Sequence, residues 1–409
     1  MEIRPTYLIM VTKENNNKYY NCFPEGDRFR VEYGRVDSTK QTTSYPISKW
    51  NSQIQSKLKK GYVDVTDTKK DLIEEVSTSN PDMTYKEIEN KVIREIVEKL
   101  QSMARETIKK NYSVKSSTVT QAMIDEAQIV LNDLSHINDT DDFNDKLLEL
   151  FVVIPRKMGN VKDYLCNNSE DFSDIIQREQ DLLDVMQGEV YKPEKHTSIT
   201  TSKDKKDFTI LDELGLEFGE VSNNEIEMIK KLMNESKNKF RKAWKVKNIE
   251  TEKRFNKFVE DNKITDTRLL FHGSRSENFW SIIKTGLMIR PANAVITGKL
   301  YGYGIYFAPL CKKSIGYTSL NGSYWASGKS NIGYMALFEV AYGKPYDVYD
   351  FDSKYYNLTY DNLQKFKKGA NCLHAHAGAS LGYSSLRNDE IVVYKEEQMT
   401  IKYLIEIGN

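Results

Sequence analysis

Three short runs of the N-terminal region, at Tyr7 to Val11, Lys18 to Phe23 and Arg28 to Tyr33, either alternate hydrophobic with polar residues or are rich in aromatic residues. The polar sequences E-N-N-N and P-E-G-D separate these runs, and such clusters are typical of tight turns. These runs predict three short strands joined by turns. The segment Pro46 to Tyr62 predicts a short helix behind them. We therefore expect a small, β-rich domain over residues 1–75.

The middle of the chain has apolar residues at helical spacing. T-Y-K-E at Thr84 to Glu87 is a capping box, which predicts the start of a helix. The apolar stripe expected behind it consists of Ile88, Val92, Ile96, Leu100 and Met103. Similar stripes occupy Val119 to Leu134, Phe143 to Ile154 and Phe172 to Met186. These patterns predict a bundle of four or more helices over residues 80–188.

A polar segment follows the predicted bundle. Gln187 to Asp207 has almost no apolar residues, which is typical of a linker, and we place that linker at residues 189–207. Residues 208–409 then form the last predicted domain.

Three motifs in this last domain set a reactive residue beside a short apolar run suited to a buried strand. They are R-L-L-F-H-G-S-R, G-Y-G-I-Y-F-A-P-L-C-K-K-S-I-G-Y and N-D-E-I-V-V-Y, and they carry His272, Tyr306 and Glu390. Alone, the histidine is more typical of packing than of binding, the tyrosine could belong to the core, and the glutamate could be solvated. Their occurrence together favours a site.

The three motifs, in this order, resemble the catalytic domain of the poly(ADP-ribose) polymerases over Leu211 to Asn409. The resemblance implies a mixed α/β domain with a split antiparallel sheet, NAD+ as a substrate rather than a redox cofactor, and no metal. It implies catalytic roles for Glu390, His272 and Tyr306. The NAD+-binding residues that it implies are His272, Gly273, Ser274, Asn278, Tyr306, Ser314 and Tyr317. Those implied on the acceptor side are Lys299, Leu300 and Lys313.

The chemistry of NAD+ cleavage suits these residue types. Loss of nicotinamide from the ribose leaves an oxocarbenium-like carbon, which a carboxylate such as Glu390 stabilises. Gly273 lacks a Cβ, so its backbone can approach the nicotinamide carboxamide closely. Tyr306 and Tyr317 would enclose the pyridinium ring, because an aromatic face attracts a cation.

Two further resemblances concern the first two domains. R-F-R-V-E-Y-G-R-V-D, with the helix after it, resembles the WGR domain of the DNA-dependent polymerases, with Tyr33 at the position of the tryptophan. This implies DNA binding, with Tyr33 stacking on a sugar or base and Arg35 contacting a phosphate. Glu149 to Gly159 resembles the helical regulatory domain, which implies helices that cover the NAD+ pocket in the resting enzyme.

The formal net charge is zero, but charge is uneven along the chain. Lys and Arg outnumber Asp and Glu by 13 to 8 in residues 1–70 and by 33 to 26 in residues 191–409, whereas acidic residues dominate residues 71–190 by 25 to 13. Such blocks indicate modules with different partners. The basic first block fits either a phosphate-binding surface or an ordinary solvated one, and charge alone does not separate the two.

Several protein classes are disfavoured. No apolar run of about 18 residues occurs and the N-terminal residues lack a signal-peptide core, so we expect neither a membrane span nor secretion. The four cysteines form no C-x-x-C pair, which argues against a zinc finger or a disulfide framework. His374 and His376 form a weak metal-ligand spacing, for which a loop near the site is the favoured interpretation.

The sequence departs from the family pattern on the acceptor side. Lys299 and Leu300 stand where an aromatic residue and a methionine are common, Met288 replaces a basic residue, and the segment between Lys368 and Glu390 is short. Acceptor choice and polymer length are therefore not fixed by the resemblance.

We predict a multidomain α+β enzyme that transfers ADP-ribose from NAD+ to protein side chains, including its own, and then to ADP-ribose itself, with DNA nicks or ends as the trigger. The alternatives are a mono-ADP-ribosyltransferase and a non-catalytic NAD+- or DNA-binding module. The expected location is the nucleus in a eukaryote, or the nucleoid-associated cytoplasm in a bacterium, and the sequence leaves the oligomeric state undefined.

Overall fold

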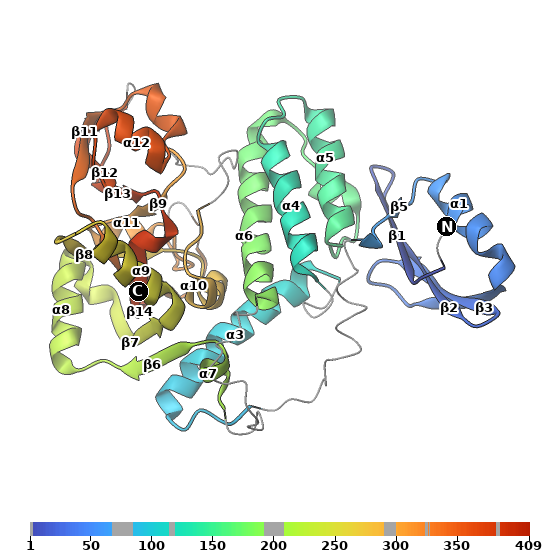
Figure 1. Ribbon diagram of the computed structural model, residues 1–409, viewed down its shortest axis with the longest axis horizontal. Coiled ribbons are helices and arrows are strands. Elements are labelled where there is room, and N and C mark those ends of the chain that lie inside the picture. Colours follow the sequence, from blue (N-terminus) through green and yellow to red (C-terminus); the bar gives the residue numbers. More distant parts are fainter. Residues whose placement is uncertain are drawn as a thin grey trace. The chain divides into compact units, whose positions relative to one another are not determined.

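The computed structural model describes residues 3–67, 85–113, 119–191, 208–289, 300–323, 326, 328–381 and 385–409 (Figure 1). The chain divides into two compact units. The first comprises Met1–Pro81, Arg105–Val190 and Asn293–Thr297, and the second comprises Asp82–Ala104, Tyr191–Ala292 and Gly298–Asn409. The domain boundaries expected from the sequence stay predictions.

The first unit begins with a five-stranded antiparallel sheet of order β4-β3-β2-β1-β5. Its strands are β1 (Thr6–Thr12), β2 (Asn16–Glu25), β3 (Arg28–Arg35), β4 (Gln41–Pro46) and β5 (Val63–Asp64). The three predicted strands are confirmed, and both predicted turns contain a residue of positive φ, Asn15 and Gly26. The alternation did not reveal β4, whose residues are polar and mostly exposed.

The predicted short helix is α1 (Trp50–Leu58), preceded by the 3-10 turn η1 (Ile47–Lys49). Trp50 and Ile54 are its buried residues, and they join a core with Phe29 and Val31 of β3. The Trp50 and Phe29 rings meet edge to face with centroids 5.0 Å apart.

Three helices of the first unit match the predicted apolar stripes: α4 (Gln121–Leu134), α5 (Thr140–Val153) and α6 (Phe172–Val190). Short 3-10 turns, η4 (Val161–Tyr164) and η5 (Ser169–Asp171), lie between α5 and α6. The Thr120 side chain caps α4 and the Asp139 side chain caps α5. α6 continues to Val190, so the first two residues of the predicted linker are helical. Residues 192–207 of that linker lie outside the described chain.

The first helix of the middle region begins later than predicted. α3 spans Lys91–Asn111, and Asn90 Oδ1 accepts hydrogen bonds from the backbone N–H groups of Val92 and Ile93. Thr84 of the expected capping box lies outside the described residues. The predicted stripe is also partly wrong, since Ile88 precedes the helix and Val92 is 41% exposed. The buried residues of α3 are Ile93, Ile96, Val97, Leu100, Ala104 and Ile108.

The second unit is built on two sheets. The larger sheet is antiparallel with order β6-β7-β14-β10-β8, and its strands are β6 (Leu216–Glu220), β7 (Phe240–Asn248), β8 (Thr267–Gly273), β10 (Ile332–Ala341) and β14 (Met399–Gly408). The smaller sheet has order β11-β12-β13-β9, and its strands are β9 (Ile305–Phe307), β11 (Pro345–Asp350), β12 (Cys372–Ser380) and β13 (Glu390–Val393). The predicted split sheet is confirmed, but β11 pairs with β12 in parallel, so the smaller sheet is mixed.

Short helices connect these strands. They are α7 (Ile210–Glu213), α8 (Asn223–Met233), α9 (Ile249–Asp261), α10 (Phe279–Thr285), α11 (Cys311–Ile315) and α12 (Tyr360–Phe366). The 3-10 turns are η7 (Asn234–Lys239), η8 (Ser276–Asn278), η9 (Ser353–Asn357) and η10 (Glu396–Gln398). This arrangement of helices around two sheets is the mixed α/β domain that the sequence predicts.

One bridge joins the two sheets. Phe271 of β8 and Ala308, next to β9, exchange backbone hydrogen bonds of 2.9 and 3.0 Å. The end of the large sheet is thereby fixed beside the small one.

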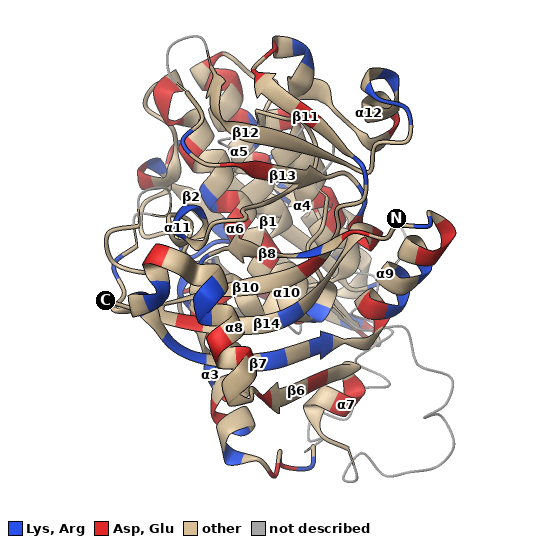
Figure 2. Cartoon of the chain, turned by 90° about the vertical axis from the view of Figure 1, so that its left-hand side faces the viewer, with Lys and Arg blue, Asp and Glu red and all other residues tan. Residues whose placement is uncertain are grey.

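Basic residues concentrate on β7 (Figure 2), where the strand carries Arg241, Lys242, Lys245 and Lys247. Neighbouring acidic residues offset part of this charge: Lys245 pairs with Glu225 at 3.0 Å, and Lys247 pairs with Glu252 at 3.2 Å. All four cysteines are free and buried. Within the described ranges, every helix is too short or too polar to cross a bilayer.

Candidate active site

Glu390 opens strand β13 and is 7% exposed. Its Oε1 forms an ion pair with Lys313 Nζ from α11. Its Oε2 is buried and has no hydrogen-bond partner among the described residues. A buried carboxylate oxygen without a partner is costly, so this oxygen is placed to accept a hydrogen bond from a bound molecule.

Lys313 supplies the counter-charge of this carboxylate. Its side chain is 15% exposed, and burial lowers the pKa of the ammonium to about 8, while Asp389 acts in the opposite direction. Direct contact with Glu390 also favours the charged ammonium. Lys313, expected on the acceptor side, therefore also contacts the predicted catalytic glutamate.

Tyr306 lies on β9, next to β13, with Val392 as its strand partner. Since side chains alternate along a strand, Tyr306 shares a face of the small sheet with Val392 and Glu390. The Tyr306 hydroxyl donates to Gly302 O at 3.0 Å and accepts from Tyr301 N–H at 3.0 Å. Burial raises the pKa of this phenol far above its usual value. The hydroxyl is thus held by the backbone, and the ring is the part of Tyr306 suited to ligand contact.

His272 stands near the end of β8. Its Nδ1 lies 3.1 Å from Tyr306 O, and because a carbonyl only accepts, Nδ1 carries the hydrogen. Burial lowers the pKa of the imidazole, which favours the neutral ring. Neutral His272 then presents an unprotonated Nε2, which can accept a hydrogen bond from a ligand hydroxyl.

Gly273 ends β8 against the backbone of Ser314 in α11. A Cβ at position 273 would lie 1.9 Å from Ser314 O, a distance that no side chain tolerates. Ser314 is 4% exposed, and its carbonyl accepts from the backbone N–H of Tyr317 at 3.1 Å. The close approach of Gly273 and Ser314 thus brings the first and second of the three motifs together.

Tyr317, Ser274 and Asn278 complete the predicted donor set. Burial is the main cause of the raised pKa of Tyr306, and the Tyr317 phenol adds a smaller electrostatic contribution. Asn278 Nδ2 donates to Ser274 Oγ at 3.0 Å, and Asn278 Oδ1 is buried without a hydrogen-bond partner in the described chain. The hydrogen bond from Asn278 therefore holds the Ser274 hydroxyl in one orientation.

Leu300 and Lys299 are the two other residues predicted on the acceptor side. Leu300 is partly buried against the core of the small sheet, beside Tyr301 and Leu358. Lys299 lies outside the described residues. The acceptor side is thus described only in part.

The two residues predicted to bind DNA lie on β3. Tyr33 is partly buried against the first unit's core, with its ring 6.0 Å from that of Tyr20. The Arg35 guanidinium donates to Asn15 O at 2.8 Å and to Gly159 O at 2.9 Å. Arg35 thus ties the sheet to the segment after α5, and its phosphate contact stays a prediction.

The expectation of a loop at His374 and His376 is wrong, because both residues lie in β12. His374 Nε2 is 3.0 Å from Asp389 Oδ2, directly before Glu390. The motif N-D-E-I-V-V-Y contains Asp389, but no local pattern showed its contact with His374, which is 15 residues away on β12.

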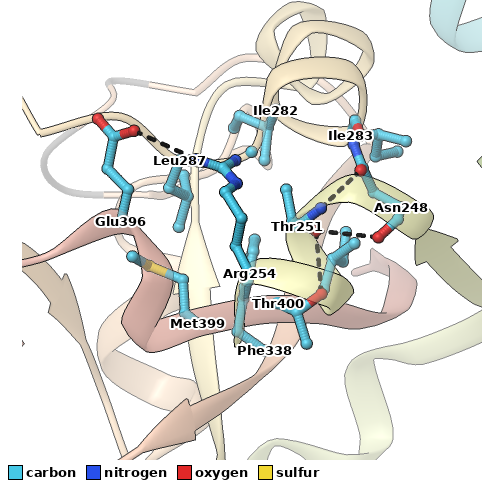
Figure 3. Close-up of a pocket in the computed structure, with 12 residues that line it drawn as sticks. Asn248, Thr251, Arg254, Ile282, Ile283, Leu287, Phe338, Glu396, Met399 and Thr400 are labelled. Atoms are coloured by element: carbon cyan, nitrogen blue, oxygen red, sulfur yellow. Dashed lines mark hydrogen bonds and ion pairs between the residues drawn. The ribbon is translucent and has the colours of Figure 1, made fainter. Parts of the chain in front are cut away.

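A separate pocket lies where α9, α10 and β14 meet (Figure 3). Asn248 Nδ2 donates to the carbonyls of Ile283 and Lys284, and the Thr251 and Thr400 hydroxyls are 3.0 Å apart. None of the predicted NAD+ residues lines this pocket. Its polar contacts join elements of the fold.

Comparison with known proteins identifies the family. The sequence model of the poly(ADP-ribose) polymerase catalytic domain matches residues 223–409. Two proteins of Invertebrate iridescent virus 6 are similar: uncharacterized protein 101L is 39% identical over 189 residues, covering 45% of this chain and 77% of that protein. The poly [ADP-ribose] polymerase-like protein 100L is 34% identical over 195 residues, covering 46% of this chain and 96% of that protein.

A longer similarity reaches beyond the catalytic domain. Poly [ADP-ribose] polymerase 1 of Danio rerio is 24% identical over 341 residues, which cover 75% of this chain and 30% of that protein. Since residues 223–409 are fewer than half of the chain, this similarity extends to residues before 223. The chain belongs to the poly(ADP-ribose) polymerase family, and residues 223–409 are its catalytic domain.

Proposed function

We propose that this protein cleaves NAD+ and transfers the ADP-ribose to protein side chains, including its own, and then to ADP-ribose itself. The observation that carries the proposal is the pairing of Glu390. One oxygen of this buried carboxylate is held by Lys313, and the other has no hydrogen-bond partner in the described chain.

The donor would be held by the three segments around this carboxylate. The neutral His272 ring offers Nε2 to an adenosine ribose hydroxyl, since Nδ1 is occupied by Tyr306 O. The missing Cβ of Gly273 lets the Ser314 backbone pack against it, and the Gly273 N–H and C=O would bind the nicotinamide carboxamide. Tyr306, fixed through its hydroxyl, presents an aromatic face to the pyridinium ring, an interaction worth ~0.5–2 kcal/mol.

Transfer would begin with cleavage of the bond between ribose C1′ and the nicotinamide nitrogen. The bonding electrons leave with nicotinamide, and positive charge develops on the ribose. Glu390 Oε2 can accept a hydrogen bond from the 2′-hydroxyl, and the carboxylate stabilises that charge most in the transition state. The acceptor oxygen then attacks C1′, and its proton passes to Glu390.

Elongation and DNA dependence are further parts of the proposal. Elongation requires an ADP-ribose hydroxyl as the acceptor, and the same carboxylate could receive its proton. The similarity to poly [ADP-ribose] polymerase 1 beyond the catalytic domain, and the basic first block, support activation by DNA breaks.

Incubation with labelled NAD+, with and without nicked DNA, followed by a denaturing gel tests the proposal. A labelled smear that strengthens with DNA is the expected result. A single sharp band would show mono-ADP-ribosylation, and equal labelling with and without DNA would remove the DNA trigger. Absence of label would contradict transferase activity altogether.

A further inference from the structure

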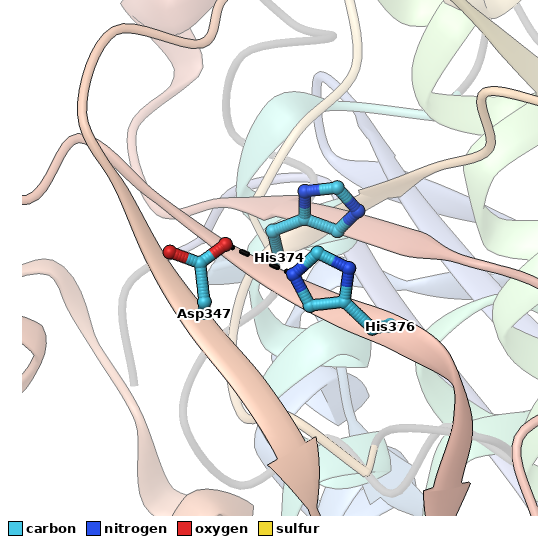
Figure 4. Close-up of side chains that lie close together, drawn as sticks. All are labelled: Asp347, His374 and His376. Atoms are coloured by element: carbon cyan, nitrogen blue, oxygen red, sulfur yellow. Dashed lines mark hydrogen bonds and ion pairs between the residues drawn. The ribbon is translucent and has the colours of Figure 1, made fainter.

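Two histidines and an aspartate meet on one face of the small sheet (Figure 4). His374 and His376 are two residues apart on β12, so strand alternation puts them on the same face. Asp347 of β11 is the parallel partner of His374 and joins them there. One potential ligand atom from each residue lies within 4.8 Å of the other two.

Direct contacts hold this cluster. Asp347 Oδ1 is 2.9 Å from His376 Nε2, and the His374 and His376 rings stack with centroids 3.9 Å apart. Tyr349 stacks on His376 with centroids 4.5 Å apart. The two imidazole rings and the Tyr349 ring therefore pack against one another before any ligand binds.

The residues that surround the cluster make contacts typical of those around a metal site. The Tyr342 hydroxyl is 2.7 Å from His374 Nδ1, and a histidine ligand characteristically uses its second nitrogen in such a bond. Lys367 Nζ lies 3.8 Å from Asp347 Oδ2, the oxygen that does not face His376. Asp389 Oδ2 is 3.0 Å from His374 Nε2, the nitrogen that would bind the ion, and Asp389 Oδ1 accepts from the backbone N–H of Ala377 at 2.8 Å.

We propose that Asp347, His374 and His376 bind a zinc ion. Two imidazole nitrogens with one carboxylate oxygen suit Zn²⁺, whereas Ca²⁺ and Mg²⁺ prefer oxygen ligands alone. Ligand atoms around tetrahedral zinc are about 3.4 Å apart, given metal–ligand distances of about 2.0–2.1 Å. Small side-chain rotations would bring the three atoms to that spacing, with the ion replacing the hydrogens that now join His376 to Asp347 and His374 to Asp389.

The ion would stabilise the part of the small sheet next to β13, the strand that carries the predicted catalytic glutamate. β12 pairs with β13 at Ala375 and Glu390, so alternation sends the Glu390 side chain to the opposite face from His374. Zinc would join β11 to β12, the strand that pairs with β13. The site is thus structural and lies behind the predicted NAD+ pocket. It does not depend on the proposed transferase activity.

Titration of chelator-treated full-length protein with zinc chloride, measured by isothermal titration calorimetry, tests the site. We expect one ion per chain in the parent and at least tenfold weaker binding in both His376→Gln and Asp347→Asn. His136→Gln changes an exposed histidine of the first unit and serves as the matched control with parent-like binding.

Thermal unfolding gives a second readout. Zinc should raise the Tm of the parent and of His136→Gln but leave both site variants unchanged. Asp347→Asn keeps the side-chain volume and an oxygen acceptor for His376, so it carries the test if His376→Gln does not fold. Failure of the parent to bind zinc, or equal binding by the parent and the site variants, would overturn the proposal.

Discussion

Lys313 and Glu390 form an ion pair that uses one carboxylate oxygen and leaves the other without a hydrogen-bond partner in the described chain. α11 supplies the lysine and β13 supplies the glutamate, so the pair joins two segments that are far apart in the sequence. The geometry separates two tasks: one oxygen is held by the protein, and the other is available to substrate.

The charge of Lys313 should therefore affect activity. Burial lowers the pKa of Lys313 to about 8, so the ammonium loses its proton as the pH rises through that value. We expect the rate of labelled ADP-ribose transfer to fall above about pH 8. A hydrogen bond to a charged group contributes about 1.5–3 kcal/mol, so Lys313→Met should lower the rate by roughly 10- to 100-fold and remove the pH-dependent fall.

The free energy of unfolding should rise over the pH range in which the transfer rate falls. The pKa of Lys313 is lowered from 10.5, so between about pH 8 and 10.5 the unfolded chain binds this proton more strongly. The contribution of Lys313 to the free energy of unfolding thus increases with pH in that range. Lys312→Met, which changes the exposed neighbour, is the control. A parent-like pH profile in Lys313→Met would contradict this role.

Gly273→Ala should disrupt the donor side of the pocket. The added Cβ would lie 1.9 Å from Ser314 O and 2.8 Å from its carbonyl carbon, so the backbone must move. We expect a loss of about 1–3 kcal/mol in stability from overpacking and at least tenfold weaker NAD+ binding, measured by calorimetry. Gly219→Ala is the control, because its Cβ would meet Lys245 Cβ at an ordinary 3.7 Å. Unchanged NAD+ affinity in Gly273→Ala would exclude the close approach as a binding requirement.

Arg35→Ala tests the predicted phosphate contact. Loss of one such contact should weaken binding to a nicked duplex and reduce the slope of log affinity against log salt by about one. Asn15→Gly keeps the positive φ at that position and the Arg35 charge, but it removes the Oδ1 that accepts from Arg35 at 2.9 Å. If Arg35→Ala weakens binding without changing the slope, as expected for Asn15→Gly, the arginine acts through packing alone.

Local patterns predicted much of the fold. The first three strands and α4, α5 and α6 follow from alternation and helical spacing, which are properties of neighbouring residues. The capping box at Thr84 did not predict the start of α3, because the side chain that accepts from the first turn of this helix is that of Asn90. β4 was missed because its polar, exposed residues lack a buried face.

In the candidate site, too, neighbouring residues predicted the motifs but not the contacts between them. The motifs around His272, Tyr306 and Glu390 were visible because each lies beside its own apolar strand. The contacts between Gly273 and Ser314 and between Lys313 and Glu390 depend on strand pairing over long separations. The cluster of Asp347 with His374 and His376 likewise depends on the parallel register of β11 with β12, which no local pattern reveals.

Glu390→Gln tests the central claim most directly. The amide keeps the size of the side chain but removes the charge that stabilises the ribose cation and receives the acceptor proton. Labelled NAD+ and a denaturing gel should show transfer slowed by roughly 100- to 1000-fold, with elongation lost more completely than the first transfer. Glu235→Gln, at an exposed position, should behave like the parent. Polymer made by Glu390→Gln at the parent's rate and length would contradict the account.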